Sequence, residues 1–293
     1  PAEALTALEA QGIPTMILKG AALALRYYQD TSLRCMRDVD ILVPPEYLPE
    51  SLRVLRDLGW TPAQDWREEA LAAFAPLRHA HSFSNGHKRE VDLHGYLFPV
   101  CLEAASQRPF WEGSVECMLG GVRTRALCTS DQLMHVCLHA ALTVHEETYD
   151  WVLDASTVLA CGEEVDWGRL VGLSRDLRIS PHIHAQLTKL RGFQPEQVPQ
   201  KVLDSLAEDR GTAWERREFA RHQSPGIACS VRGMAWLHLR DYQRWKARIG
   251  PSGEDSGYLR YLQLHWNLRH RRQAPGMLMR RVRKKLAAAA STE

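Results

Sequence analysis

Hydrophobic and polar positions alternate in two different ways along this chain. Up to about residue 127, short apolar runs bounded by Gly or Pro are interleaved with stretches in which apolar residues recur every three or four positions. Short apolar runs predict buried strands, and the three- to four-residue recurrence predicts helices. We expect strands near 15–18, 38–43, 80–84, 89–94 and 121–127, and helices near 2–11, 20–28 and 46–58.

After Ser130 the strand signals fade and helical spacing dominates. Ser130 is a suitable N-cap for a helix that begins at Asp131, and apolar residues from Leu133 to Ala141 line one face of that helix. Further helices are expected near 148–160, 166–176, 180–191, 199–222 and 229–248.

This order of elements predicts an α+β protein, in which a small mixed β-sheet with flanking helices is followed by an α-helical C-terminal domain. The sheet domain is expected over residues 1–127 and the helical domain over 128–250. Residues 251–293 are expected to be a flexible connection and a basic C-terminal segment packed on or near the helical domain. A chain of 293 residues is long enough to bury a sizeable core.

The composition is that of an ordinary globular protein, with 45% hydrophobic and 25% charged residues. A net charge of +2 gives no global reason to expect a nucleic-acid partner. The seven cysteines are scattered without a framework spacing, which favours reduced thiols and a cytoplasmic protein. No apolar run reaches the roughly twenty residues that span a bilayer. Because the chain begins at Pro1 inside a helical pattern, a preceding segment stays open, as does the oligomeric state.

Two aspartates stand one residue apart inside the apolar run near 38–43. The side chains of Asp38 and Asp40 project from the same face of the expected strand, because strand residues alternate between faces. Two like charges on one face repel each other and resist loss of water. A divalent cation between them would remove both costs, and Mg²⁺ prefers carboxylate oxygens. The pattern therefore predicts a metal site; the alternative is that Asp38 pairs with Arg34 or Arg37.

The preceding turn predicts a phosphate-binding element. A short strand ending at Leu18 is followed by Lys19, Gly20 and Ala21 at the start of a helix. Glycine lets the backbone approach a ligand closely, and the free N–H groups of a helix start favour phosphate. Lys19 adds a positive charge for an anion. A phosphate-binding turn followed within twenty residues by paired aspartates is the order that nucleotidyl transfer requires.

Three motifs carry a resemblance to a known family, and the similarity extends over roughly residues 10–190. The motifs are Leu18-Lys19-Gly20, Arg34 to Val43, and Val91-Asp92-Leu93-His94, with weaker similarity at Ser130 to His139, Trp151 to Asp154 and Val165 to Trp167. Together they resemble the DNA-polymerase-β-like nucleotidyltransferase superfamily, and most closely its bacterial group of uncharacterised nucleotidyltransferases. One departure is Ala21, which stands where that superfamily has Gly or Ser and offers no hydroxyl to a phosphate.

The resemblance implies a catalytic nucleotidyltransferase domain with three carboxylates, those of Asp38, Asp40 and Asp92. Asp38 and Asp40 would hold Mg²⁺, with Mn²⁺ as the alternative ion. Asp92 would share the metals and act as a base or orienting group for the attacking hydroxyl. A nucleoside triphosphate, ATP among the candidates, would be the co-substrate.

The nucleotide-binding residues implied by the same resemblance are Lys19, Gly20 and Ala21 for the triphosphate. Arg34 or Arg37 would stabilise the phosphates, unless it forms an ion pair with an aspartate instead.

Several histidines and one further aspartate are expected near this centre. His94, His81 or His139 would contact the nucleotide or the acceptor, although a structural role is the stronger interpretation for His135 and His139. A zinc site would need three or four ligands at suitable spacing, which the histidines do not offer. Asp154 is either a helix charge or a contact to the acceptor hydroxyl.

The predicted function is metal-dependent transfer of a nucleoside monophosphate from a nucleoside triphosphate to a hydroxyl or phosphate acceptor, with release of pyrophosphate. A small molecule or peptide metabolite is the favoured acceptor. One alternative is a toxin-like enzyme that modifies RNA or protein, and another is a non-catalytic nucleotide-binding protein of the same fold. The strongly basic segment after Tyr258 has three interpretations: a solvated helix packed on the protein, an anion or RNA contact, or a membrane-surface helix.

Overall fold

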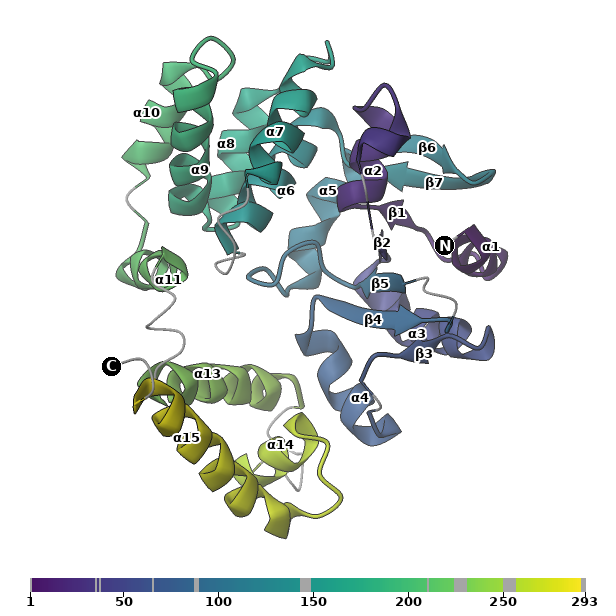
Figure 1. Ribbon diagram of the computed structural model, residues 1–293, viewed down its shortest axis with the longest axis vertical. Helices are drawn as coiled ribbons and strands as arrows, with labels where there is room; N and C mark the ends of the chain where they lie inside the picture. Colours follow the sequence, from purple (N-terminus) through teal and green to yellow (C-terminus); the bar gives the residue numbers. More distant parts are fainter. Residues whose placement is uncertain are drawn as a thin grey trace. The chain divides into compact units, whose positions relative to one another are not determined.

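A seven-stranded sheet runs through the first half of the chain (Figure 1). The strand order is β3-β4-β5-β2-β1-β7-β6. The pairs β2–β5 and β1–β7 are parallel and the other pairs are antiparallel, which confirms the predicted mixed sheet. The strands are β1 (Met16–Ile17), β2 (Asp38–Leu42), β3 (Thr61–Pro62), β4 (Ala80–Ser84), β5 (Glu90–His94), β6 (Val115–Leu119) and β7 (Val122–Ala126).

The coordinates are a computed structural model of the 293-residue chain. The residues that it describes are 2–34, 36, 38–64, 66–86, 90–142, 149–209, 211–223, 231–249 and 257–290.

Local sequence explains the central strands and one hairpin. Strand β2 carries the buried residues Val39 and Ile41, whose β-branched side chains favour extended backbone. The β6–β7 hairpin, whose first strand the pattern does not predict, turns at Gly120 and Gly121 with φ of +59° and +83°. Two consecutive positive φ values are the geometry of a tight hairpin turn, and glycine adopts them without steric cost.

Helices cover the sheet and bury its apolar side chains. Helix α1 contacts α3 and β7, and α2 contacts β2. The core beneath them contains Leu5, Leu8, Ile17 and Ile41, all fully buried. These helices are α1 (Ala2–Ala10), α2 (Lys19–Arg26), α3 (Leu48–Asp57) and α5 (Arg108–Glu112), with short 3₁₀ turns at Thr31–Leu33, Pro45–Tyr47 and Ala104–Gln107.

Five further helices share one hydrophobic core with the sheet, and a sixth, α11, contacts α6 and α9. Met16 and Leu42 of the sheet belong to the same buried cluster as Leu133 and Leu187 of the helices. Helix α6 lies at the centre of this group and contacts α7, α8 and α9, while α9 also contacts α10. These helices are α6 (Thr129–Leu142), α7 (Asp150–Ala160), α8 (Trp167–Asp176), α9 (Ser180–Phe193), α10 (Gln200–Glu208) and α11 (Ala213–Gln223).

Two local predictions in this region are wrong. Ser130 lies inside α6 rather than at its cap, and its Oγ accepts a hydrogen bond of 2.7 Å from the backbone N–H of Asp166. The helix expected over 199–222 is two helices, because the chain turns between them at Gly211, where φ is +58°. Both differences arise from contacts or backbone angles that a helical periodicity does not encode.

A second compact unit combines residues from two distant parts of the chain. It contains Gln64–Arg78 and Ser224–Glu293, whereas Pro1–Ala63 and His79–Gln223 form the first unit. Its core includes Phe74 from the first segment and Tyr261 from the second, with ring centroids 5.6 Å apart. Its helices are α4 (Glu68–Phe74), α13 (Val231–Ile249), α14 (Tyr258–His265) and α15 (Ala274–Ala290), with 3₁₀ turns at Ala75–Leu77 and Arg271–Gln273.

The sheet and the helical region that follows it confirm the predicted fold class. The domain boundaries at residues 127 and 250 stay a prediction, since packing units need not coincide with domains. Within the described ranges, the helices are too short or too polar for any of them to cross a bilayer.

Candidate active site

The turn between β1 and α2 aims a lysine at the centre of the sheet. The backbone N–H of Leu18 donates to the carbonyl of Asp40 over 3.0 Å, which holds the turn against β2. Lys19 then adopts a φ of +44°, in the left-handed region that residues other than glycine rarely occupy. Its ammonium nitrogen lies 2.5 Å from Oδ1 of Asp40. A strained backbone angle is thus kept at the residue that makes this ion pair.

Gly20 is required by close packing rather than by a positive φ, since Lys19 is the residue in the left-handed conformation. A Cβ atom at Gly20 would lie 3.2 Å from Cβ of Met36, which is tighter than ordinary van der Waals contact. Ala21 is buried in the first turn of α2. The first N–H groups of any helix lack intrahelical acceptors, and the phosphate-binding role of this turn stays a prediction.

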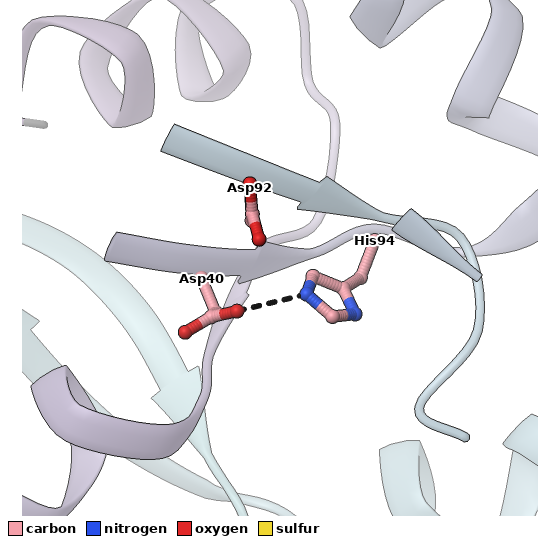
Figure 2. A group of neighbouring side chains, drawn as sticks. All are labelled: Asp40, Asp92 and His94. Atoms are coloured by element: carbon pink, nitrogen blue, oxygen red, sulfur yellow. Dashed lines mark hydrogen bonds and ion pairs between the residues drawn. The ribbon is translucent and has the colours of Figure 1, made fainter. Parts of the chain in front are cut away.

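Parallel pairing of β2 with β5 brings the carboxylates together. Asp40 lies directly opposite Asp92, and Leu42 lies opposite His94. Because strand residues alternate between faces, Asp92 and His94 share the face on which Asp40 projects. Figure 2 shows the three side chains converging from the two strands. Nε2 of His94 lies 2.9 Å from Oδ1 of Asp40.

Asp40 is the electrostatic centre of the group. It is 3% exposed, and burial by itself would raise its pKa. Hydrogen bonds from His94 and Lys19, together with their positive charges, outweigh burial and hold the pKa of Asp40 well below its usual range. The carboxylate therefore stays ionised in the folded protein.

Asp38 lies on the same face of β2 as Asp40, but its pKa is shifted in the opposite direction. Burial, followed by the negative charges of Asp40 and Asp92, raises the pKa of Asp38. The three carboxylates are therefore close enough to interact, as the sequence predicts. Clustered carboxylates of this kind are stabilised by a cation, which lowers the pKa of each.

The donor set fits a divalent cation. In the described part of the chain, the ligand atoms of Asp40, Asp92 and His94 form a group within 4.8 Å of one another, and Asp38 lies outside it. Two carboxylates and an imidazole suit Mn²⁺ as well as Mg²⁺, since Mn²⁺ accepts nitrogen ligands more readily. Nδ1 of His94 is buried without a hydrogen-bond partner among the described residues, so the ring is only half satisfied.

Arg34 and Asp154 lie together, in the ion pair that the sequence leaves as an alternative to phosphate binding. Nε of Arg34 lies 2.9 Å from Oδ1 of Asp154, and Nη2 lies 3.1 Å from Oδ2. The hydroxyl of Tyr28 donates to Oδ1 of Asp154 over 2.8 Å. This contact ties the segment before β2 to helix α7. Arg37 lies outside the described residues.

The expected histidines lie at different distances from the group. His139, exposed on α6, is close enough to Lys19, Asp40 and His94 to respond to their charges. His81 lies opposite Leu93 in the β4–β5 pair, which places its side chain on the other face of the sheet from Asp92 and His94.

His79 also contacts this group, although the sequence did not single it out from the neighbouring histidines. The ring of His79 meets that of His94 edge-on, with centroids 5.4 Å apart. Burial, followed by the charges of His94 and Lys19, lowers the pKa of His79 to about 3, so this ring is neutral. A run of four histidines between residues 79 and 94 is the signal in the sequence, but the pattern does not say which of them touches the site.

Comparison with known proteins gives one sequence match that covers most of the sheet and the first helices after it. The sequence model of a family described as "Uncharacterised nucleotidyltransferase" matches residues 2–162. No curated protein matches the sequence.

Two solved structures of ANT(2″)-Ia are similar to this chain at a low level. One is a crystal structure in complex with adenylyl-2″-tobramycin, which is 14% identical and covers 60% of this chain and 94% of that chain, with a TM-score of 0.41. The other is a solution structure that calls the protein an antibiotic-resistance factor; it is 13% identical and covers 66% and 92%, with the same TM-score. Similarity at this level gives no argument about substrates.

Proposed function

Because the chain belongs to the family of uncharacterised nucleotidyltransferases, we propose that it transfers a nucleoside monophosphate from a nucleoside triphosphate to an acceptor. The acceptor group would be a hydroxyl or a phosphate, and pyrophosphate would be released. A divalent cation would bind at Asp40 and Asp92. The observation that carries this proposal is the convergence of Asp40, Asp92 and His94 on one face of the sheet, beside Lys19. The favoured acceptor is a small molecule or a peptide metabolite.

Each residue of the group has a role in this proposal. Asp40 and Asp92 would hold Mg²⁺ or Mn²⁺, with His94 as a further ligand or as the group that orients Asp40. The bound ion would neutralise charge that develops on the phosphates. The pKa of Asp38 is raised by burial and by its acidic neighbours. The bound ion would lower that pKa, and Asp38 would then be the third ionised carboxylate of the site.

The first turn of α2 would bind the triphosphate. The N–H groups at Gly20 and Ala21 point to the open end of the helix, where an anion is favoured. Lys19 would then exchange its contact with Asp40 for one with a phosphate oxygen. Without a hydroxyl at Ala21, the backbone supplies the hydrogen bonds at that position.

The proposal is tested by pyrophosphate release from each of the four nucleoside triphosphates, with Mg²⁺ or Mn²⁺ and a panel of acceptors, followed by mass spectrometry of the products. Asp40→Asn and Asp92→Asn should each lower turnover by about 10³-fold or more, since an electrostatic group at the reacting phosphates is lost. The matched control is Asp57→Asn, which removes one carboxylate from the exposed surface of α3. Near-normal turnover in either site variant would contradict the proposal.

The exposed arginines of α15 would instead favour a macromolecular acceptor; they include Arg280, Arg281 and Arg283. A macromolecular acceptor such as RNA should lose affinity when these three are replaced by glutamine. Charge replacement is a better test than truncation, because the C-terminal segment supplies Tyr261 and Leu262 to the core of the second unit. The non-catalytic alternative predicts nucleotide binding without pyrophosphate release from any acceptor.

A further inference from the structure

The two compact units carry net charges of opposite sign. The second unit, which contains Gln64–Arg78 and Ser224–Glu293, has 16 basic and seven acidic residues, a net charge of +9. The first unit therefore has a net charge of −7, since the whole chain has +2. A nearly neutral total thus conceals one strongly basic unit. Charge asymmetry of this kind within one chain is typical of proteins that bind a polyanion.

The basic residues of the second unit are concentrated after Gly257. From Gly257 to Ala290 the chain has nine arginines and lysines and no acidic residue. Every basic residue in this stretch up to Arg283 is an arginine. Six of these arginines are exposed and lie in the turn before α15 or in its first three turns: Arg269, Arg271, Arg272, Arg280, Arg281 and Arg283.

The acidic side chains of this unit do not neutralise these arginines. Three acidic side chains of the unit lie among the described residues, and two of them are paired elsewhere. Glu69 forms an ion pair with Arg260, and Asp241 forms one with Arg240. The third, Glu68, is exposed in the first turn of α4. The positive charge beside α15 is therefore left for an external partner.

The arginines of α15 present their guanidinium groups on the surface. Within the described ranges, Arg272, Arg280 and Arg283 enter no ion pair. Arg280 and Arg283 are three residues apart and so are neighbours on one face of the helix. The guanidinium of Arg281 lies over the half-buried ring of Trp266, 5.2 Å from its centroid. A guanidinium stacked on an indole in this way leaves its other face for a further planar group.

The apolar side of α15 is used inside the unit, which argues against insertion into a membrane. Helix α15 contacts α13 and α14 (Figure 1). Ala274 belongs to the buried cluster of the unit, and Met277 packs against it. The large apolar side chains that the described part of α15 exposes are Leu278 and Met279, at 37% and 55%. A membrane-surface helix needs a wider apolar face than these two residues provide.

We propose that the exposed arginines between Arg269 and Arg283 bind single-stranded RNA, through its phosphates and its unpaired bases. Arginine pairs its N–H groups with phosphate oxygens. Its plane also stacks on unpaired bases, which a single strand offers and duplex DNA does not. This binding goes beyond the proposed transfer reaction, because it concerns the second unit by itself and needs neither the cation nor the nucleoside triphosphate. RNA is a partner of this surface whether or not it is also the acceptor.

The test is fluorescence anisotropy of the full chain with a labelled single-stranded RNA of about 20 nucleotides, without nucleotides or divalent cations, between about 50 and 300 mM KCl. Affinity should fall as the salt concentration rises, since each phosphate contact releases counterions. Replacing both Arg280→Gln and Arg283→Gln should weaken binding about tenfold. The slope of log affinity against log salt should become shallower by about 1.4, at about 0.7 for each lost phosphate contact.

The matched control replaces two exposed arginines of the first unit, Arg123→Gln together with Arg217→Gln. It should bind RNA as the wild-type protein does. Asp40→Asn should also keep the RNA affinity, so that a failure of RNA binding and a failure of the proposed transfer reaction are distinguishable. Circular dichroism checks that each variant is folded.

Arg281→Lys separates stacking from charge. Lysine keeps the positive charge but has no plane to stack on a base. Affinity for the single-stranded RNA should therefore fall about threefold or more, because base stacking is lost, while affinity for a DNA duplex of the same length stays the same. The wild-type protein should bind that duplex more weakly than the RNA.

Equal RNA affinity in the wild type and in the folded variant with Arg280→Gln and Arg283→Gln would overturn the proposal. Unchanged RNA affinity in Arg281→Lys, or a DNA duplex bound as tightly as the RNA, would contradict it as well. Binding to vesicles of phosphatidylcholine and phosphatidylserine without binding to RNA would assign the surface to a membrane instead.

Discussion

Asp40 accepts two hydrogen bonds on one oxygen atom, from Lys19 and from His94. A buried carboxylate without such partners would be costly, and its pKa would rise. Here its partners keep it ionised at 3% exposure. The second oxygen makes no hydrogen bond to the described residues and is available to a cation. The site is therefore charged and ordered before any ligand binds, as preorganised electrostatic catalysis requires.

Lys19 gives a prediction that separates nucleotide binding from metal binding. Lys19→Met should raise the KM for the nucleoside triphosphate about tenfold, because a positive charge beside the phosphates is lost. Mn²⁺ should raise the melting temperature of the variant as it is expected to raise that of the wild type, since Asp40 and Asp92 are intact. Steady-state kinetics and thermal shift measurements check the two parts. An unchanged KM would place the triphosphate elsewhere.

His135 on α6 gives a prediction about pH. The residue is 2% exposed, and burial, followed by the charges of His139 and Lys19, holds its pKa well below the usual value. The unfolded chain binds a proton at His135 near pH 6.5 and the folded chain does not. The free energy of unfolding should therefore fall as the pH decreases below about 6.5, by up to about 1.4 kcal/mol per pH unit from this residue.

The measurement is urea unfolding between pH 5 and pH 7.5 for the wild type and for His135→Leu. The variant should show a shallower dependence on pH, because one source of proton uptake on unfolding is removed. An identical dependence in both proteins would mean that His135 is protonated when folded.

At the scale of elements, the β6–β7 hairpin shows how a turn sets a strand pair. Gly120 and Gly121 make the turn that joins the two strands, and a Cβ at Gly120 would come within 2.9 Å of Cβ of Ala2. Strand β7 in turn pairs with β1 and so borders the turn that carries Lys19. A change in the geometry of this hairpin would therefore displace β7 and, through its pairing with β1, the turn that carries Lys19.

Gly121→Ala should lower the free energy of unfolding by about 1 kcal/mol or more, because alanine at a φ of +83° is strained. The matched control is Gly172→Ala within α8, where a Cβ meets nothing within 4 Å. Alanine should stabilise that helix by about 0.5–1 kcal/mol. Denaturant unfolding measures both; a stabilising Gly121→Ala would contradict the assigned turn.

At the scale of the whole molecule, the chain leaves the first unit after Ala63 and returns to it at His79. The excursion places α4 against α14, almost two hundred residues later in sequence. Within the second unit, the backbone N–H of Arg67 donates to Oδ1 of Asn267 over 3.0 Å. Each unit has its own hydrophobic cluster, so each can unfold as a cooperative block.

Scanning calorimetry should therefore resolve two transitions. Phe74→Ala removes a ring from the core of the second unit and should lower one transition, since such a truncation costs about 3–5 kcal/mol. Leu187→Ala, at a fully buried position in the first unit, should lower the other at a cost of about 2–5 kcal/mol. A single transition that both variants shift equally would mean that the two clusters unfold together.

Short runs of apolar residues identified β1, β2, β4, β5 and β7 to within one residue at each end, since such a run is a local property of the sequence. The order of Lys19, Asp38 and Asp40 predicted a phosphate-binding turn before a pair of carboxylates, and the structure places Lys19 beside Asp40; phosphate binding at the turn stays a prediction. The sequence missed β3 and β6, which are short or half-exposed strands, and it missed α4 altogether. Weak periodicity over five to seven residues does not separate a strand or helix from a loop.

What the sequence determined by itself is most of the central local elements, the fold class, and the residue types that a nucleotidyl-transfer site needs. The tertiary structure decided which of those residues meet. The parallel register of β2 with β5 selects Asp92 and His94 as the neighbours of Asp40 and places His81 on the other face. Tertiary packing also decided that Arg34 pairs with Asp154, and that α4 packs against α14 in the second unit. Those outcomes depend on long-range pairing and packing, which a local pattern of hydrophobic and polar residues leaves open.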